Sequence, residues 1–193
     1  DISPEDVFEG LDAAGNRLAK PWGPKPQGSD APPDITVRFQ SKDTAKGEFS
    51  NLQQAVDYAV ALGAKPNGPR VIDIGSGFFE GPVIIPPNAP PLVLRGAGAD
   101  TSVIAAPIDA QMTGLEYATR FKATIARAGA STKAMFAQIT ARSHIGTHNT
   151  AVLRVMRNDV EISGLIIRND YACDSVSAAP RGDEPDATGR FAR

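Results

Sequence analysis

The feature that most constrains this chain is a succession of short apolar segments separated by Gly, Pro and Asn. Four such segments begin at residues 71, 83, 92 and 102, so their starts are 12, 9 and 10 residues apart. After an interruption, residues 151–156, 160–162 and 165–167 resume the same pattern. Short strands at this spacing are typical of an antiparallel sandwich or of a solenoid of parallel strands.

Two observations favour the solenoid. The connections between these segments contain no Asn-Gly or Asp-Gly pair, the usual signal of a two-residue hairpin. The segments are also nearly continuous apolar runs, as expected when strands must fill a stacked interior, whereas a half-exposed strand alternates. The sequence therefore predicts parallel strands, with the sandwich kept open as the alternative.

A strand and a helix precede these segments. Residues 35–39 alternate with period two and are predicted to form a strand. Ser50 and Gln53 have the spacing of a capping box, and apolar residues behind them recur at helical spacing up to Gly63 and Pro66. The helix is therefore predicted to begin just after Ser50 and to end before Gly63.

Composition excludes several classes of protein. Among 193 residues, Lys and Arg number 20 and Asp and Glu 22, a net charge of −2, which argues against nucleic acid as a partner. No apolar run is long enough to span a bilayer. The 18 Gly and 16 Pro together make up about 18% of the residues, against a usual share of about 12%. This excess predicts many turns and little helix. The single cysteine, Cys173, rules out an internal disulfide.

The chain divides into three parts by composition. Residues 1–34 are Pro-rich and are predicted to form an extended arm held by Trp22, or else a flexible leader. Residues 35–172 form the strand-rich domain, within which 106–149 are a long excursion of the kind that builds a binding surface or a lid. Residues 173–193 are predicted to be a polar loop or tail.

The ordered set of motifs resembles the pectinesterase (pectin methylesterase, carbohydrate esterase family 8) family, in particular its bacterial branch. The matching segments are residues 49–57, 71–74, 77–85, 92–98, 101–104 and 164–170. Within the family's Gly-x-Tyr-x-Glu signature, Phe79 replaces Tyr and Gly81 replaces Glu, with Glu80 displaced by one position. The resemblance implies an all-β, right-handed parallel β-helix with an N-terminal capping α-helix, incomplete at its C-terminal end.

The resemblance also implies a chemistry. In the family an Asp attacks the ester carbonyl, a second Asp acts as general acid and base, an Arg keeps the nucleophile ionised, and Gln side chains stabilise the oxyanion. These groups lie in Gly-Tyr-Gln-Asp-Thr, Asp-Phe-Ile-Phe-Gly and Gly-Arg-Pro-Trp runs beyond the segment that ends here at Asp170, and none occurs in this sequence. No residue of this chain is therefore predicted to be catalytic.

One substrate contact is carried over from the family. Thr147, in the pair Gly146-Thr147, falls where bacterial relatives place a Thr on the sugar-binding cleft. Thr147 and its neighbour His148 are therefore the candidate substrate-binding residues, and a plain turn-forming Thr is the alternative.

Other residues are assigned structural roles. His144 and His148 are four apart, but Gly146 disfavours the helix that would bring them together, so no metal site is predicted. Cys173 is expected to be a passive thiol. Residues 96–100 are interpreted as a turn, since the Lys of a phosphate loop is absent. Asn169 is interpreted as occupying a left-handed bend.

The sequence thus predicts the N-terminal part of a pectinesterase-like enzyme that hydrolyses methyl esters of polygalacturonate without a cofactor. Its expected partners are pectin and a C-terminal fragment of the same precursor, docked on the last coil, because an uncovered coil leaves unpaired strand edges. The expected location is secreted or periplasmic. The alternatives are a related esterase or thioesterase and a non-catalytic carbohydrate-binding β-solenoid.

Overall fold

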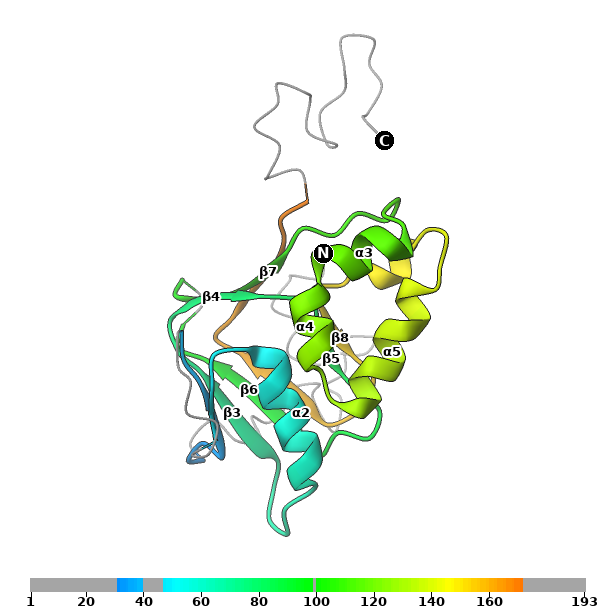
Figure 1. The fold of residues 1–193 in the computed structure, drawn as a ribbon. Coiled ribbons are helices and arrows are strands. Elements are labelled where there is room, and N and C mark those ends of the chain that lie inside the picture. Colours follow the sequence, from blue (N-terminus) through cyan, green and yellow to red (C-terminus); the bar gives the residue numbers. More distant parts are fainter. Residues whose placement is uncertain (1–30, 40–46, 99, 172–193) are drawn as a thin grey trace, which may run out of the picture.

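The computed structural model describes residues 31–39, 47–98 and 100–171. These residues form short strands and helices arranged around one hydrophobic core (Figure 1). The strands are β1 (Ile35–Val37), β2 (Glu48–Phe49), β3 (Arg70–Ile74), β4 (Gly77–Glu80), β5 (Val83–Ile85), β6 (Leu92–Gly96), β7 (Ser102–Ala106), β8 (Leu153–Val155), β9 (Val160–Ser163) and β10 (Ile166–Asn169). The helices are α2 (Leu52–Leu62), α3 (Gly114–Arg120), α4 (Lys122–Arg127), α5 (Ala130–Thr140) and the 3-10 helix η2 (Thr147–Asn149).

Within the described ranges the strands form three sheets, and every pairing in them is parallel. The first sheet has the order β2-β1-β3-β6-β9, the second β10-β7-β4, and the third β5-β8. The chain visits the sheets in a fixed order, since β3, β4 and β5 lie in the first, second and third sheet. Strands β6, β7 and β8 repeat that order, and β9 and β10 begin it again. This confirms the predicted parallel strands and excludes hairpin pairing between residues 71–74 and 83–85.

The parallel registers stack apolar side chains in columns. In the first sheet Ile72 of β3 lies beside Leu94 of β6, which lies beside Ile162 of β9. The first two are buried completely, as is usual for strands in the interior of a layered fold. The layers therefore share one core, and their stacking explains why the strand segments read as continuous apolar runs.

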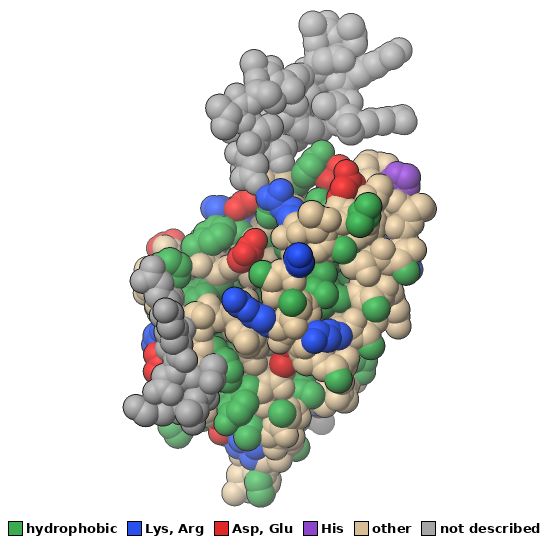
Figure 2. Space-filling model, in the orientation of Figure 1, with side chains coloured by type: hydrophobic (Ala, Val, Ile, Leu, Met, Phe, Trp, Pro, Cys, Tyr) green, Lys and Arg blue, Asp and Glu red, His purple; other side chains and the backbone are tan. Residues whose placement is uncertain are grey.

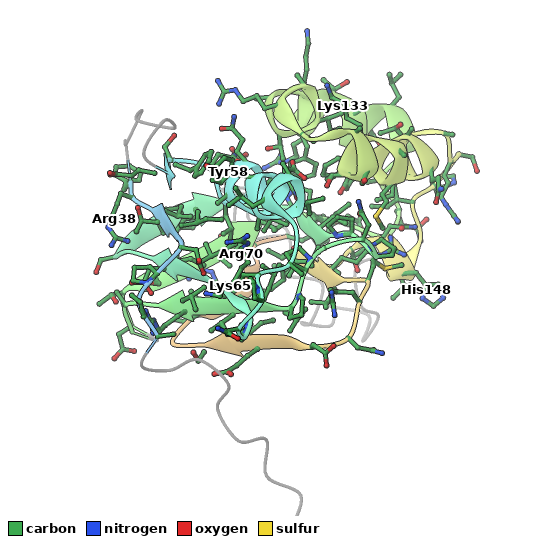
Figure 3. All side chains as sticks on the ribbon, turned by 90° about the horizontal axis from the view of Figure 1, so that it is seen from below. Arg38, Tyr58, Lys65, Arg70, Lys133 and His148 are labelled. Carbon is green, nitrogen blue, oxygen red and sulfur yellow. The ribbon has the colours of Figure 1, made fainter. Side chains whose placement is uncertain are left out.

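Helix α2 covers one end of the stack, with its buried face over β1, β2, β3 and β5 (Figure 3). Its predicted apolar face is confirmed at Leu52, Ala55, Val56 and Ala59, which are buried. The predicted cap is wrong by one residue, because the N-cap is Asn51, whose side chain accepts from the backbone N–H of Gln54 at 3.1 Å. The helix ends at Gly63, whose φ of 67° suits glycine.

Gln53 has a different role from the predicted capping box. Its buried side-chain amide accepts from the backbone N–H of Ile84 at 2.7 Å and donates to the Ile84 carbonyl at 3.0 Å. It also donates to Asp57 and to Thr132 of α5. Asp57 in turn accepts from the Thr132 hydroxyl at 2.6 Å and from the backbone N–H of Gly129 at 2.7 Å. This network joins α2 to β5 and to α5.

The excursion at residues 106–149 is mainly helical, although the described part of the chain as a whole has few helices, as predicted. Helices α3, α4 and α5 stand beside the sheets as a small cluster (Figure 1). Tyr117 and Phe121 meet edge to face at 4.8 Å, and Tyr117 and Phe136 lie 6.4 Å apart, all three buried. The aromatic residues that look isolated in the sequence thus form the core of this cluster, which the composition of the segment alone does not reveal.

Two of the predicted parts fall outside the described residues. Residues 1–30 of the predicted arm, with Trp22, and the predicted tail at 173–193, with Cys173, remain predictions. Of the helices in the described ranges, none has the length and apolar character needed to cross a membrane.

Candidate functional site

A surface hollow of about 690 Å³ lies where α3 meets the segment after β7 and Tyr171, two residues after the end of β10. Its volume is in the range typical of small-molecule sites. We call it the α3 hollow. Its lining residues are Asp109, Gln111, Met112, Leu115, Glu116, Thr119, Arg120 and Tyr171. Charged and apolar side chains lie close together in this region of the surface (Figure 2).

Asn169 holds two walls of the α3 hollow together. Its side-chain oxygen accepts from the backbone N–H groups of Ile108 and Tyr171, each at 3.0 Å, and its amide donates to the Ile108 carbonyl at 2.8 Å. The predicted left-handed conformation is wrong, because among described non-glycine residues only Asp159 has a positive φ. Asn169 therefore acts through its side chain, joining the end of β10 to the segment after β7.

Helix α3 is fixed at its start by a capping box that the sequence reading missed. The Thr113 hydroxyl accepts from the backbone N–H of Glu116 at 3.2 Å, and the Glu116 carboxylate accepts from the backbone N–H of Thr113 at 2.7 Å. These bonds from Thr113 favour the charged form and lower the pKa of Glu116 below its usual 4.5. The Thr-x-x-Glu spacing at 113–116 is the signal that reveals this helix from the sequence.

Tyr171 and Asp109 form a second fixed pair in the α3 hollow. A hydrogen bond with the Asp109 side chain, together with the negative charge of Asp109, raises the pKa of the Tyr171 hydroxyl above its usual 10. Asp109 also accepts from the backbone N–H of Gln111 at 3.2 Å. The Tyr171 ring is nearly half exposed, so it offers an aromatic surface beside two carboxylates.

The predicted substrate-binding residues lie close to one wall of the α3 hollow. Thr147 and His148 are both exposed and belong to η2, and His148 lies at the outside of the molecule (Figure 3). The residues just before η2 pair with the segment after β7, since Ile145 N–H donates to the Met112 carbonyl at 2.9 Å and Gly146 N–H to the Ala110 carbonyl at 3.0 Å. The structure leaves their role in substrate binding a prediction.

The Thr147 backbone also forms a turn, which is the alternative that the sequence left open. Its carbonyl accepts from the backbone N–H of Thr150 at 3.2 Å and from the Thr150 hydroxyl at 2.8 Å. His148 lies in η2, and His144 precedes it in a segment with no helix. Within the described ranges, no three His, Cys, Asp or Glu side chains are grouped so as to hold a metal ion.

An Asp–Arg pair lies on the first sheet, away from the α3 hollow. Asp73 of β3 and Arg95 of β6 are register partners, and Arg95 Nε lies 2.7 Å from Asp73 Oδ1. Arg95 also donates to the Ala31 carbonyl at 3.0 Å. Together with Arg38, this pair borders a smaller hollow of about 190 Å³. We interpret the pair as a cross-strand ion pair, because it joins neighbouring strands in register and holds the start of the described chain.

The comparisons with known proteins point in one direction. No protein-family model matches the chain. Over 126 residues it is 31% identical to pectinesterase B of Dickeya dadantii (strain 3937), an alignment covering 62% of this chain and 28% of that protein. The chain thus spans less than a third of the curated relative that it matches.

Pectin methylesterases are also among the solved structures that are similar to this chain. The rice weevil pectin methyl esterase superposes with a TM-score of 0.62 at 25% identity, covering 77% of this chain and 38% of that one. Escherichia coli YbhC gives a TM-score of 0.59 at 20% identity, covering 84% and 40%. A pectin methylesterase variant in complex with a hexasaccharide gives 0.50 at 19% identity, covering 83% and 37%.

Sequence and structure comparisons therefore agree with the motifs quoted above. The alignment to pectinesterase B exceeds 30% identity, and the weevil enzyme superposes on most of this chain. Each alignment covers well under half of the relative's own length. The resemblance to pectinesterases is thus confirmed: over the aligned residues this chain is similar in sequence and in fold to a part of the pectinesterase chain.

Proposed function

We propose that this chain is part of a pectinesterase-like carbohydrate esterase that hydrolyses the methyl esters of polygalacturonate. In this reaction water adds to each ester carbonyl, methanol leaves, and a carboxylate and a proton remain. The identity to pectinesterase B supports the class of reaction, and a structural neighbour solved with a bound hexasaccharide supports a polysaccharide substrate. Thr147 and His148 are proposed to face that substrate.

The proposed fold is a right-handed parallel β-helix with α2 as its cap and further coils beyond β10. The observation that carries the proposal is the end of each apolar column. Ile162, Ile167 and Val155 are 38%, 44% and 38% exposed, whereas their register partners Leu94, Ile104 and Ile85 are buried. Apolar side chains that continue a buried column but face solvent indicate a surface made to be covered.

Backbone pairing leads to the same conclusion. Among the described residues, β8, β9 and β10 each pair with a strand on one side only. Parallel sheets in layered folds are normally covered, and exposed edges are aggregation hazards that proteins protect. We infer that another coil of the same precursor continues the three sheets and carries the two Asp, the Arg and the Gln donors. The chain of 193 residues by itself is then inactive.

The proposed location is secreted or periplasmic, because pectin is an extracellular polymer. The related esterase or thioesterase and the non-catalytic carbohydrate-binding solenoid are retained as outcomes of the test.

The test is methanol release from methyl-esterified pectin. The 193-residue chain should release none above background, whereas the product of the complete reading frame, or the chain mixed with its C-terminal fragment, should release methanol in step with new carboxylates. Hydrolysis of a thioester or another ester in place of pectin would support the first alternative. Binding of pectin with no hydrolysis by the complete product would support the second.

A further inference from the structure

We propose that the α3 hollow is a sugar-binding subsite for methyl-esterified, uncharged galacturonate residues. The inference rests on the proposed function and adds to it a place on this chain where substrate and product are distinguished. The hollow has room for a sugar residue, at about 690 Å³, and it combines an aromatic ring with apolar and hydrogen-bonding side chains.

The side chains of the α3 hollow match the two faces of a sugar. The exposed part of the Tyr171 ring can stack on the apolar C–H face of a pyranose. Asp109 and Glu116 offer carboxylate oxygens, which accept from sugar hydroxyls, while Gln111 and Thr119 can both donate and accept. The walls are held in place independently of ligand, by Asn169 on one side and by the Thr113 capping box on the other.

The charges of the α3 hollow favour the ester over the acid. Glu116 is held ionised by the hydrogen bonds from Thr113, and Asp109 accepts bonds from Gln111 and pairs with Tyr171. Arg120 is the one cationic side chain in the lining, against two carboxylates. A de-esterified galacturonate would bring a third carboxylate into this site, whereas the methyl ester brings an apolar group beside Met112 and Leu115.

The test measures binding to the 193-residue chain by isothermal titration calorimetry. The probes are a fully methyl-esterified hexagalacturonate and the fully de-esterified oligomer of the same length. The esterified probe should bind more tightly. Tyr171→Ala should weaken its binding about three- to tenfold, the range expected for loss of one aromatic contact. Leu115→Asp should weaken it as well, and since Leu115 is highly exposed this variant retains the fold.

The matched control is Phe78→Ala, which removes an equally exposed aromatic ring from β4, outside the α3 hollow. It should leave binding unchanged. Asp109→Asn should shift the preference several-fold toward the de-esterified probe, an effect that a purely structural role of Asp109 does not produce. Equal binding of the two probes, or an equal loss in Tyr171→Ala and Phe78→Ala, would overturn the proposal.

Failure of the subsite and failure of the proposed function give different results. If the complete product releases methanol and Tyr171→Ala leaves its KM and its probe binding unchanged, the subsite is wrong and the esterase assignment stands. If the complete product releases no methanol, the assignment as an esterase is wrong. The two-probe comparison then still shows whether the α3 hollow recognises the esterified sugar.

Discussion

Gln53 shows how one buried amide can join parts of the molecule that are distant in the sequence. Its side chain satisfies both backbone groups of Ile84 and reaches Thr132, 79 positions further along the chain. An amide is suited to this place because it both donates and accepts, whereas a carboxylate only accepts. The same side chain read from the sequence alone fits a capping box, because local spacing says nothing about a partner in another strand.

Gln53→Ala should lower the free energy of unfolding by about 3 kcal/mol, because it leaves the buried N–H and C=O of Ile84 without partners. Urea unfolding followed by circular dichroism measures the change. The control is Gln54→Ala on the same turn, expected to cost less than about 0.5 kcal/mol, as is usual for residues without buried partners. Equal losses in both variants would contradict the role assigned to Gln53.

Asp34 makes an ion cluster with Lys65 and Arg70, which lie together below α2 (Figure 3). Partial burial by itself raises the pKa of Asp34, but the hydrogen bonds from Lys65 and Val71 and the charges of Lys65 and Arg70 outweigh it. The pKa of Asp34 is therefore below its usual 3.8. The folded chain thus holds this proton less tightly than the unfolded chain does.

The stabilisation by Asp34 is therefore complete above the unfolded pKa of 3.8 and is lost as pH falls through the lower folded pKa. Asp34→Asn should cost about 1 kcal/mol or less at pH 7, the range for partly exposed ion pairs. The difference from the unsubstituted chain should shrink as unfolding is measured toward pH 3. A difference that stays constant from pH 7 to pH 3 would show that the charge of Asp34 does not contribute.

At the scale of elements, the cap of α2 decides how the covering helix begins. Asn51→Ala should destabilise the chain by about 1 kcal/mol, because the backbone N–H of Gln54 loses its partner. Ser50→Ala, one residue earlier, should change stability by less than about 0.5 kcal/mol. Thermal or urea unfolding of the two variants compares the observed cap directly with the one that the sequence predicted, and a larger loss in Ser50→Ala would favour the latter.

The helices α3, α4 and α5 illustrate why short elements are hard to predict. Each is too short to be stable alone, so its helical state depends on packing around Tyr117, Phe121 and Phe136. Gly114 fits because α3 begins against the end of α5, where a Cβ on Gly114 would lie 2.2 Å from the Thr140 carbonyl oxygen. Local sequence pattern contains the Thr113 cap but not this contact.

At the scale of the whole molecule, the stack of layers should be most stable near α2 and least stable at β9 and β10. Amide hydrogen exchange measured by mass spectrometry on the 193-residue chain should be slowest in β3 and β6, which have strands on both sides, and several-fold faster in β9 and β10. Binding of the C-terminal fragment should slow exchange in β9 and β10. Unchanged exchange there would contradict docking on that layer.

Many of the strands and the position of helix α2 could be predicted from the sequence. The apolar runs beginning at residues 71, 83, 92 and 102 are strands, and α2 buries most of its predicted face. Strand β4 is identified in the sequence only by its family motif, and β2, with two residues, is too short to leave a pattern. Thr147 is the residue that the family resemblance identifies and His148 is its neighbour, and the role of both in substrate binding stays a prediction.

By itself, the sequence determined most of the strand segments, the place of α2 and the family that the chain resembles, because hydrophobic periodicity and turn residues act over a few neighbours. Only the tertiary structure decided that β6 lies between β3 and β9, that Gln53 bonds to Ile84, and that Tyr171 meets Asp109 across the α3 hollow. These contacts join residues tens of positions apart, and their partners are selected by the packing of the whole core, which no local pattern records.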